Sequence, residues 1–269
     1  MSMMPTLVSL HRYPFKSMMG EELNAAKVTP RGLFGDRAYA LRDTETGKVI
    51  SAKNPRKWPN MFRYRAAYVS PPETETSLPP ARVTLPDGRF AVTSSADFAA
   101  TVSSALGRQV TLLTAPPADA QLEEYWPDMD GLAHRDAVTD EAMPQGTFFD
   151  LATLHVLTTA TLDKLSELYP AGRFEPRRFR PNLIIDVPDL EGFVENDWIG
   201  KTLTIGNEVS IQITGPCPRC VMTTLAQGDL PKDPGVLKTA ARYNEVRVGV
   251  YASVLQPGMI HIGDGVKIQ

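Results

Sequence analysis

Cys217 and Cys220 are the only two thiols of the chain, and two residues separate them. Two thiols at this spacing can form a redox pair, half of a zinc site, or one functional thiolate with a bystander. A structural zinc site normally needs four ligands. The remaining nitrogen ligands are four widely scattered histidines, His11, His134, His155 and His261. A zinc site is therefore disfavoured.

The residues after the pair also disfavour a redox role. A thioredoxin-like motif opens a helix after a strand, whereas residues 221–225 predict another strand. What remains is one thiolate on a β scaffold, or a thiol that is merely a small buried hydrophobe. In the first case the neighbouring Arg219 favours the ionised form by Coulomb attraction. A soft thiolate suits a soft or high-valent metal centre.

A run of four arginines within residues 173–182 forms a second group of candidate side chains. Arg180 and Asn182 flank Pro181 at the entrance of a predicted buried strand. A rigid guanidinium fork and an amide placed there could clamp a phosphate or the edge of a heterocycle. The alternative is an ordinary solvated loop, and the local residues leave both interpretations open.

Two loops near the N-terminus supply a third group. The sequence Tyr-Pro-Phe-Lys-Ser places Lys16 and Ser17 after a proline that ends a strand, and Gly-Leu-Phe-Gly-Asp-Arg ends in Arg37. Loops on rigid scaffolds commonly carry binding groups. In isolation, a lysine and an arginine in the positions of Lys16 and Arg37 are more often surface charges. No Walker loop or Rossmann glycine fingerprint is present, so a nucleotide cofactor lacks support.

Short strands must carry these groups in the N-terminal third of the chain. Strands are expected at residues 7–13, 37–42, 48–51, 82–85 and 89–92. The last four form two hairpins, because turn-forming residues such as Pro-Asp-Gly connect them. A short helix is expected over residues 95–106.

The C-terminal half is also mostly β. Strands are expected at residues 154–157, 183–187, 203–205, 209–213, 246–254 and 260–268, and helices at 159–169 and 235–243. Residues 116–146 lack sustained periodicity and are rich in Pro, Asp and Gly, which is typical of a linker. We therefore divide the chain into residues 1–115, a linker at 116–146, and residues 147–269.

Composition restricts the classes of partner. The 269 residues carry a formal net charge of -3, so no global charge favours nucleic acid. No apolar run approaches the roughly 18 to 20 residues that cross a bilayer, and no targeting segment is evident. We expect no transmembrane segment and a cytoplasmic location, and any anion site must be local.

Taken together and in this order, these segments resemble the MOSC family. The likeness is greatest to proteins that join a MOSC N-terminal β-barrel region to a MOSC domain, such as the mitochondrial amidoxime-reducing component and its bacterial relatives. It covers nearly the whole chain and rests on Tyr-Pro-Phe-Lys-Ser at 13–17, Gly-Asp-Arg at 35–37, Arg-Phe-Arg-Pro-Asn at 178–182, Cys-Pro-Arg-Cys at 217–220 with Thr-Thr at 223–224, and Pro-Gly-Met-Ile-His-Ile-Gly-Asp at 257–264. The resemblance implies a mainly β fold, in which an N-terminal β-barrel-like region packs on a C-terminal MOSC β-barrel, with a few short helices and the cofactor between the two regions.

The resemblance also implies a cofactor and its ligands. Cys220, after an arginine and before the Thr-Thr pair, is implied to coordinate molybdenum beside the pterin dithiolene of the molybdenum cofactor, Mo-molybdopterin, whereas Cys217 is not the expected ligand. The residues implied to contact the pterin or its phosphate are Lys16, Ser17, Arg37, Arg180, Asn182 and Arg219. Asp150 falls where relatives have another cofactor-contacting segment, although Leu151 and Ala152 stand in place of more polar residues.

The implied reaction is a two-electron reduction of small N-hydroxylated or N-oxide substrates, in which the oxygen leaves as water. Cys220 anchors and tunes the metal in this reaction and does not attack the substrate. Some bacterial relatives carry an iron-sulfur ferredoxin domain, whereas no cysteines remain here for a cluster. Electrons are therefore expected from a separate protein of ferredoxin or cytochrome type with its reductase.

Two other functions stay open. MOSC domains also occur in molybdenum cofactor sulfuration, so the chain could be a cofactor or sulfur carrier in which Cys220 holds a persulfide. A protein of this fold that has lost the cofactor is the third alternative. The reductase requires bound molybdenum, whereas the carrier would not turn over an N-hydroxylated substrate.

Overall fold

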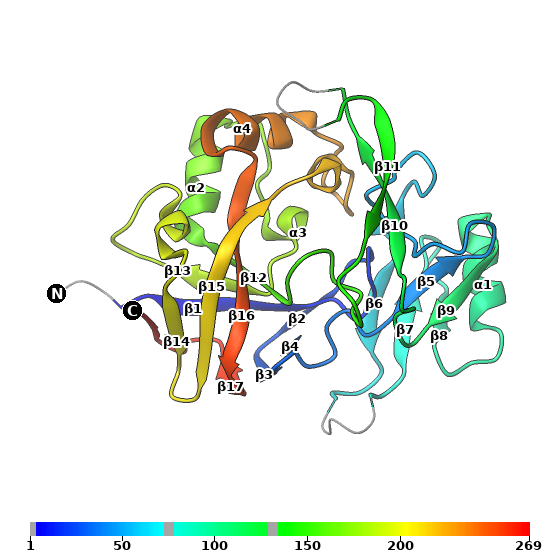
Figure 1. Cartoon of the computed structure of the whole chain (residues 1–269), viewed down its shortest axis with the longest axis horizontal. Coiled ribbons are helices and arrows are strands. Elements are labelled where there is room, and N and C mark those ends of the chain that lie inside the picture. The colour runs from blue at the N-terminus through cyan, green and yellow to red at the C-terminus, as the bar shows by residue number, and fades with distance from the viewer. Residues whose placement is uncertain (1–3, 73–77, 129–133) are drawn as a thin grey trace.

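The computed structural model describes residues 4–72, 78–128 and 134–269 and is mainly β (Figure 1). An eight-stranded sheet organises the C-terminal half. Its strands, in spatial order, are β18 (Val266–Ile268), β14 (Thr202–Ile205), β15 (Val209–Pro218), β16 (Arg247–Gln256), β12 (Leu154–Thr158), β13 (Leu183–Asp186), β1 (Thr6–Arg12) and β2 (Glu21–Leu23). Because β1 pairs with β13, the first strand of the chain is part of the C-terminal sheet.

Smaller sheets make up the remaining β structure. They are β17 (Gly258–His261) with β3 (Ala25–Thr29) and β4 (Gly32–Leu33), β5 (Ala40–Asp43) with β9 (Val110–Leu113), β6 (Arg65–Tyr68) with β7 (Ala81–Thr84) and β8 (Phe90–Val92), and β10 (Gln121–Trp126) with β11 (Ala137–Ala142). The β7–β8 and β14–β15 hairpins confirm two sequence predictions. The predicted strand over residues 260–268 is interrupted by its turn and becomes β17 and β18.

The helices are short. They are α1 (Phe98–Leu106), α2 (Thr159–Leu168), α3 (Pro176–Phe179) and α4 (Pro234–Asn244), with the 3-10 turns η1 (Met61–Arg63), η2 (Val194–Trp198) and η3 (Val221–Thr224). The three helices that the sequence predicts are confirmed to within a few residues. Among the described residues, no helix combines the length and apolarity needed to cross a membrane.

Three further segments differ from the sequence predictions. Residues 48–51, expected to be a strand, contribute only isolated β-bridges at Val49. The strand expected at residues 221–225 is wrong, because this segment forms η3, in which the Thr223 and Thr224 hydroxyls donate to the preceding Cys220 and Val221 carbonyls. Residues 116–146, expected to be a linker, contain the β10–β11 hairpin. In Figure 1 this hairpin stands between the eight-stranded sheet and the N-terminal strands. The division of the chain into domains at the proposed bounds stays a prediction.

A buried carboxyl group in η2 gives the fold a dependence on pH. Burial raises the pKa of Glu195, although the Thr158 and Thr161 hydroxyls donate to its Oε2 at 2.7 Å each and oppose the rise. Oε1 is buried and has no hydrogen-bond partner among the described residues. Folding therefore makes protonation of this carboxyl more favourable than it is in the unfolded chain.

We expect the stabilising effect of protonated Glu195 to be complete below the unfolded-state pKa of about 4.3 and to be lost as the pH rises through the higher folded-state pKa. Glu195→Gln keeps the shape and removes the titration. Urea unfolding between pH 4 and pH 8 should show a smaller decline in the free energy of unfolding for the variant than for the wild type. Parallel curves would contradict the assignment.

Candidate functional site

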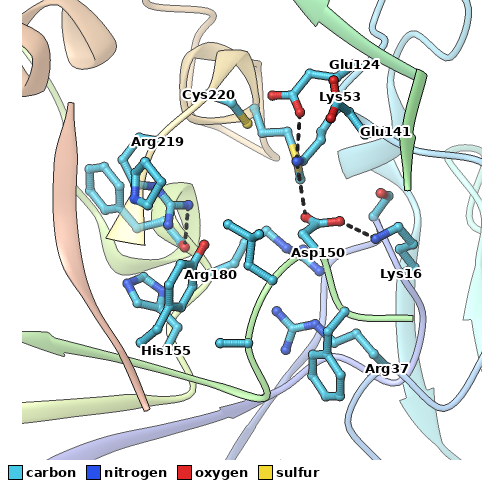
Figure 2. A pocket seen from close by; sticks show the side chains of 18 of the residues that line it. Lys16, Arg37, Lys53, Glu124, Glu141, Asp150, His155, Arg180, Arg219 and Cys220 are labelled. Carbon is cyan, nitrogen blue, oxygen red and sulfur yellow. Dashed lines mark hydrogen bonds and ion pairs between the residues drawn. The ribbon is translucent and has the colours of Figure 1, made fainter. Parts of the chain in front are cut away.

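A cavity of about 430 Å³ brings together residues from both halves of the chain (Figure 2). Five separate segments contribute the side chains that the sequence singles out. All eight predicted residues line this cavity: Lys16, Ser17, Arg37, Asp150, Arg180, Asn182, Arg219 and Cys220. Their convergence is a property of the fold, whereas their individual roles stay predictions.

Three of these residues have backbone conformations that non-glycine residues rarely adopt. Ser17, Arg37 and Arg180 have φ angles of 64°, 47° and 56°. Non-glycine residues in the left-handed region carry strain, and such strain clusters at ligand-binding sites. Arg180 ends α3 in this conformation, so the helix stops just where the guanidinium turns to the cavity.

Cys220 precedes η3 and is partly exposed at the cavity wall. The next turn packs into the N-terminal core through Met222, so a C-terminal loop is fixed against N-terminal residues. Burial raises the pKa of the Cys220 thiol, whereas the nearby Lys53 ammonium opposes the rise. A bound metal ion would overcome this effect, because a coordinated thiol is deprotonated.

Arg219 interacts more closely with Cys217 than with Cys220, although its charge acts to lower the pKa of both thiols, as expected from the sequence. Its Nη1 donates to Cys217 Sγ at 2.6 Å, and its Nη2 donates to the Phe179 carbonyl at 2.8 Å. Cys217 is fully buried. Burial alone would raise the pKa of Cys217, but Arg219 and His155 outweigh it and lower the pKa to about 6. Cys217 therefore orients Arg219 and does not line the cavity.

Two arginines of the wall, Arg37 and Arg180, lie against the same aromatic ring behind it. The guanidinium carbons of Arg37 and Arg180 lie 4.3 and 4.2 Å from the centroid of the Tyr13 ring. Arg37 Nη1 donates to Asp36 Oδ2 at 2.5 Å, and Arg180 Nη1 donates to the Met18 carbonyl at 2.5 Å. These contacts hold two guanidinium groups in place before any ligand binds.

Lysine and carboxylate side chains that line the cavity form a series of ion pairs. Lys16 donates to the Phe148 carbonyl at 3.0 Å and to Asp150, and Lys53 Nζ lies 3.9 Å from the other Asp150 oxygen. Burial opposes ionisation of Asp150, but the two ammonium groups outweigh it and lower the pKa of this carboxyl well below its usual range. Lys53 also donates to Glu124 at 2.9 Å.

Ser17 and Asn182 have structural partners as well as cavity positions. The Ser17 hydroxyl accepts from the Ala52 amide at 3.0 Å, which leaves its own proton free to donate. Asn182 Nδ2 donates to Asp36 Oδ2 at 2.9 Å, and its Oδ1 accepts from the His155 amide at 3.1 Å. Asn182 thus joins the N-terminal loops to β12 and holds this part of the wall together.

The sequence did not single out several residues of the wall. These are Lys53, Glu124, Trp126, Glu141, His155 and Tyr251, among others. Glu124, Trp126 and Glu141 belong to the segment expected to be a linker. Buried and more exposed residues alternate along most of β10, but polar and apolar residues alternate only weakly in its sequence. Lys53 belongs to no recognisable sequence motif.

The cavity suits an anionic group that carries a soft metal. Five cationic side chains face three carboxylates on its wall, and Cys220 offers a sulfur ligand. Arg219 Nε is buried and has no hydrogen-bond partner within the described part of the chain, as expected where a polar ligand completes the site. Among the described residues, no group of three or more His, Cys, Asp or Glu side chains could hold a metal ion. A metal at Cys220 would therefore need ligands from a cofactor.

Comparison with known proteins accounts for this arrangement. The model of the MOSC N-terminal beta barrel domain matches residues 4–117, and the model of the MOSC domain matches residues 145–267. The YUAD protein from Bacillus subtilis has a similar structure over 100% of this chain and 97% of its own, with a TM-score of 0.50 at 12% sequence identity. This similarity concerns the fold alone.

Curated relatives match a shorter part of the chain. Molybdenum cofactor sulfurase 1 of Aedes aegypti is 38% identical over 82 residues, which are 30% of this chain and 10% of that protein. Molybdenum cofactor sulfurase of Drosophila pseudoobscura pseudoobscura is 38% identical over 78 residues, 28% of this chain and 9% of that protein. The chain thus matches about a tenth of the length of these relatives. With the two family models together matching most of its residues, the chain belongs to the MOSC family, as a protein that joins a MOSC N-terminal beta barrel domain to a MOSC domain.

Proposed function

We propose that the cavity binds the molybdenum cofactor, Mo-molybdopterin, and that the protein uses it to reduce N-hydroxylated or N-oxide compounds. The observation that carries the proposal is the convergence of the partly exposed Cys220 thiol and five cationic side chains on one cavity. A thiolate suits a soft or high-valent metal, and guanidinium groups suit the phosphate of the pterin.

When bound, the cofactor supplies a molybdenum centre that exchanges electron pairs and accepts oxygen atoms. Each turnover breaks one N–O bond of the substrate, consumes two electrons and two protons, and releases one water molecule. A separate protein of ferredoxin or cytochrome type, with its reductase, supplies the electrons. The cofactor-dependent oxidoreductase thus needs both an external donor and a small N-oxygenated substrate.

The residues of the chain bind and orient in this proposal. Cys220 is the protein's ligand to the metal, and Arg37 and Arg180 hold the anionic part of the cofactor. Burial lowers the pKa of Lys53, but Asp150, Cys220 and Glu124 outweigh it and raise the pKa above its ordinary value. The Lys53 ammonium therefore stays charged and stabilises a thiolate at Cys220.

The first test is the molybdenum content of the protein made in a host that synthesises the cofactor. We expect near-stoichiometric molybdenum and pterin in the wild type. Arg180→Ala should lower the pterin content severalfold, because it removes the buried guanidinium while leaving the thiol ligand. Wild-type protein that repeatedly lacks both molybdenum and pterin would overturn the proposal.

The similarity to molybdenum cofactor sulfurases favours a second candidate function. In it the protein carries the cofactor or sulfur, and Cys220 holds a persulfide. Mass spectrometry of the Cys220 peptide after incubation with a cysteine desulfurase and cysteine separates the two functions. A stable persulfide without reduction of any N-oxygenated substrate would favour the carrier.

A further inference from the structure

The β10–β11 hairpin forms part of the cavity wall, although it lies outside both segments that the family models match. Those models end at residue 117 and resume at residue 145. Glu124 and Trp126 of β10 and Glu141 of β11 nevertheless line the cavity. Figure 2 shows Glu124 and Glu141 on the side of the cavity where Lys53 and Cys220 also lie. Electrostatic coupling between Cys220 and both Lys53 and Glu124 agrees with this view.

The register of the hairpin places these residues on one face. Leu122 lies opposite Glu141, and Glu124 lies opposite Thr139. Side chains of directly opposed residues share a face, as do alternate residues along a strand. Glu124, Trp126, Thr139 and Glu141 therefore form a common surface, which we call the inward face.

Hydrogen bonds fix the inward face before a ligand binds. Trp126 Nε1 donates to the Thr139 hydroxyl at 2.8 Å, and this hydroxyl donates to Glu141 Oε1 at 2.6 Å. The indole ring and the carboxylate are thus held side by side. Glu124 has Lys53 as a counter-charge, whereas Thr139 is the one hydrogen-bond partner of Glu141 within the described part of the chain, and no cation pairs with it there.

The opposite face attaches the hairpin to the N-terminal β structure. Lys48 Nζ lies 2.5 Å from Asp140, Asn54 donates to Glu123 at 3.0 Å, and the Tyr125 amide donates to the Lys53 carbonyl at 2.8 Å. These contacts do not involve the inward-facing Trp126 and Glu141 side chains, so we expect the hairpin to stay attached when either is replaced.

The two sides of the cavity have opposite character. Arg37 and Arg180 suit an anionic cofactor, while Glu141 and the Trp126 ring suit a positive charge attached to an aromatic group. Resting on the proposed function, we propose that the inward face is the substrate subsite. It selects N-oxygenated substrates that carry a cationic group on an aromatic ring.

Two aryl N-hydroxyl compounds of the same shape test the selection, one with a trimethylammonium group and one with a neutral tert-butyl group. With dithionite as electron donor, we expect kcat/KM of the molybdenum-loaded wild type to favour the cationic compound about tenfold, because only the cation gains Coulomb attraction to Glu141 and a cation–π contact with Trp126. Glu141→Gln should reduce this preference to near unity. Asp140→Asn, which removes a carboxylate from the opposite face, should keep it.

A binding measurement separates failure of this inference from failure of the proposed function. The other two tryptophans, Trp58 and Trp198, are only 4% exposed, so a cavity ligand should quench mainly Trp126 fluorescence. The corresponding aryl trimethylammonium ion, which has no N–O bond, should quench the wild type at lower concentration than the tert-butyl analogue. Trp126→Phe should remove the signal.

Charge-selective quenching without turnover of either compound would reject the reductase and keep a cation-binding subsite. Equal quenching by both probes, or an unchanged kcat/KM preference in Glu141→Gln, would overturn the inference even if the protein reduces N-oxygenated compounds.

Discussion

Cys220→Ser should lose reductase activity by more than about 100-fold, since even an outer partner of a metal ligand typically contributes roughly 10- to 100-fold. Serine keeps a small polar side chain but replaces the soft sulfur with a hard oxygen that ionises far less readily. Molybdenum content and kcat should fall together, because Cys220 is the one thiol that lines the cavity among the described residues. The measurement is metal analysis of each preparation beside single-substrate kinetics.

Cys217→Ala is the matched control for this thiol. Cys217 is buried and accepts from Arg219 without lining the cavity, so its loss should loosen Arg219 and reduce activity only severalfold. Equal losses in Cys217→Ala and Cys220→Ser would refute the assignment of Cys220 as the ligand. A wild-type protein that carries a persulfide at Cys220, together with a Cys220→Ser variant that keeps all of its molybdenum, would refute this assignment as well.

Arg178→Met should cause the largest loss of stability. Arg178 is 1% exposed, and its guanidinium donates to the carbonyls of Arg173 at 2.7 Å, Thr223 and Leu225 at 3.3 Å each, and Pro231 at 3.0 Å. Methionine leaves these acceptors without their donor. Each hydrogen bond to a charged group contributes about 1.5–3 kcal/mol, so we expect a loss of at least about 3 kcal/mol and a Tm lower by roughly 10 °C.

The adjacent Arg177 supplies the control for Arg178. Its guanidinium pairs with Glu175 and Asp229 at 2.6 Å each, at the protein surface, where ion pairs contribute roughly 0–1 kcal/mol. Arg177→Met should therefore shift the Tm by only a few degrees. Because Arg178 holds the turn after Cys220, its loss should also lower molybdenum retention. Equal Tm shifts for the two variants would show that the buried donors do not stabilise this turn.

Strong periodicity made much of the fold predictable. Residues 154–169 combine an apolar strand with leucines at helical spacing, and β12 and α2 form there as predicted. The strand predicted at residues 221–225 was wrong, because a five-residue run of apolar and β-branched side chains is compatible with both a strand and a 3-10 turn. The 3-10 turn depends on hydrogen bonds that the Arg178 guanidinium donates to its carbonyl groups. One acceptor is the carbonyl of Thr223, which lies 45 positions after Arg178. Such a long-range donor leaves no local pattern in the sequence.

The candidate site was predictable only to the extent that its motifs resemble a family. That resemblance pointed to the eight residues that now share a cavity, but it could not orient them. The Arg219 guanidinium lies against Cys217 because strand β15 buries that sulfur beside it, which spacing alone does not determine. Glu124, Trp126 and Glu141 were missed because their exposure alternates on a half-buried hairpin without any motif.

The pairing of β1 with β13 can form only late in synthesis. Leu183, the partner of Leu10 in the register, is translated more than half of this sequence later than Leu10. At about 5–20 residues per second, β1 waits roughly ten to thirty seconds on the ribosome with an open edge. An unpaired strand edge is a template for association with other chains. Nascent chains of this protein therefore pass through an interval in which chaperone binding to β1 would raise the folded yield.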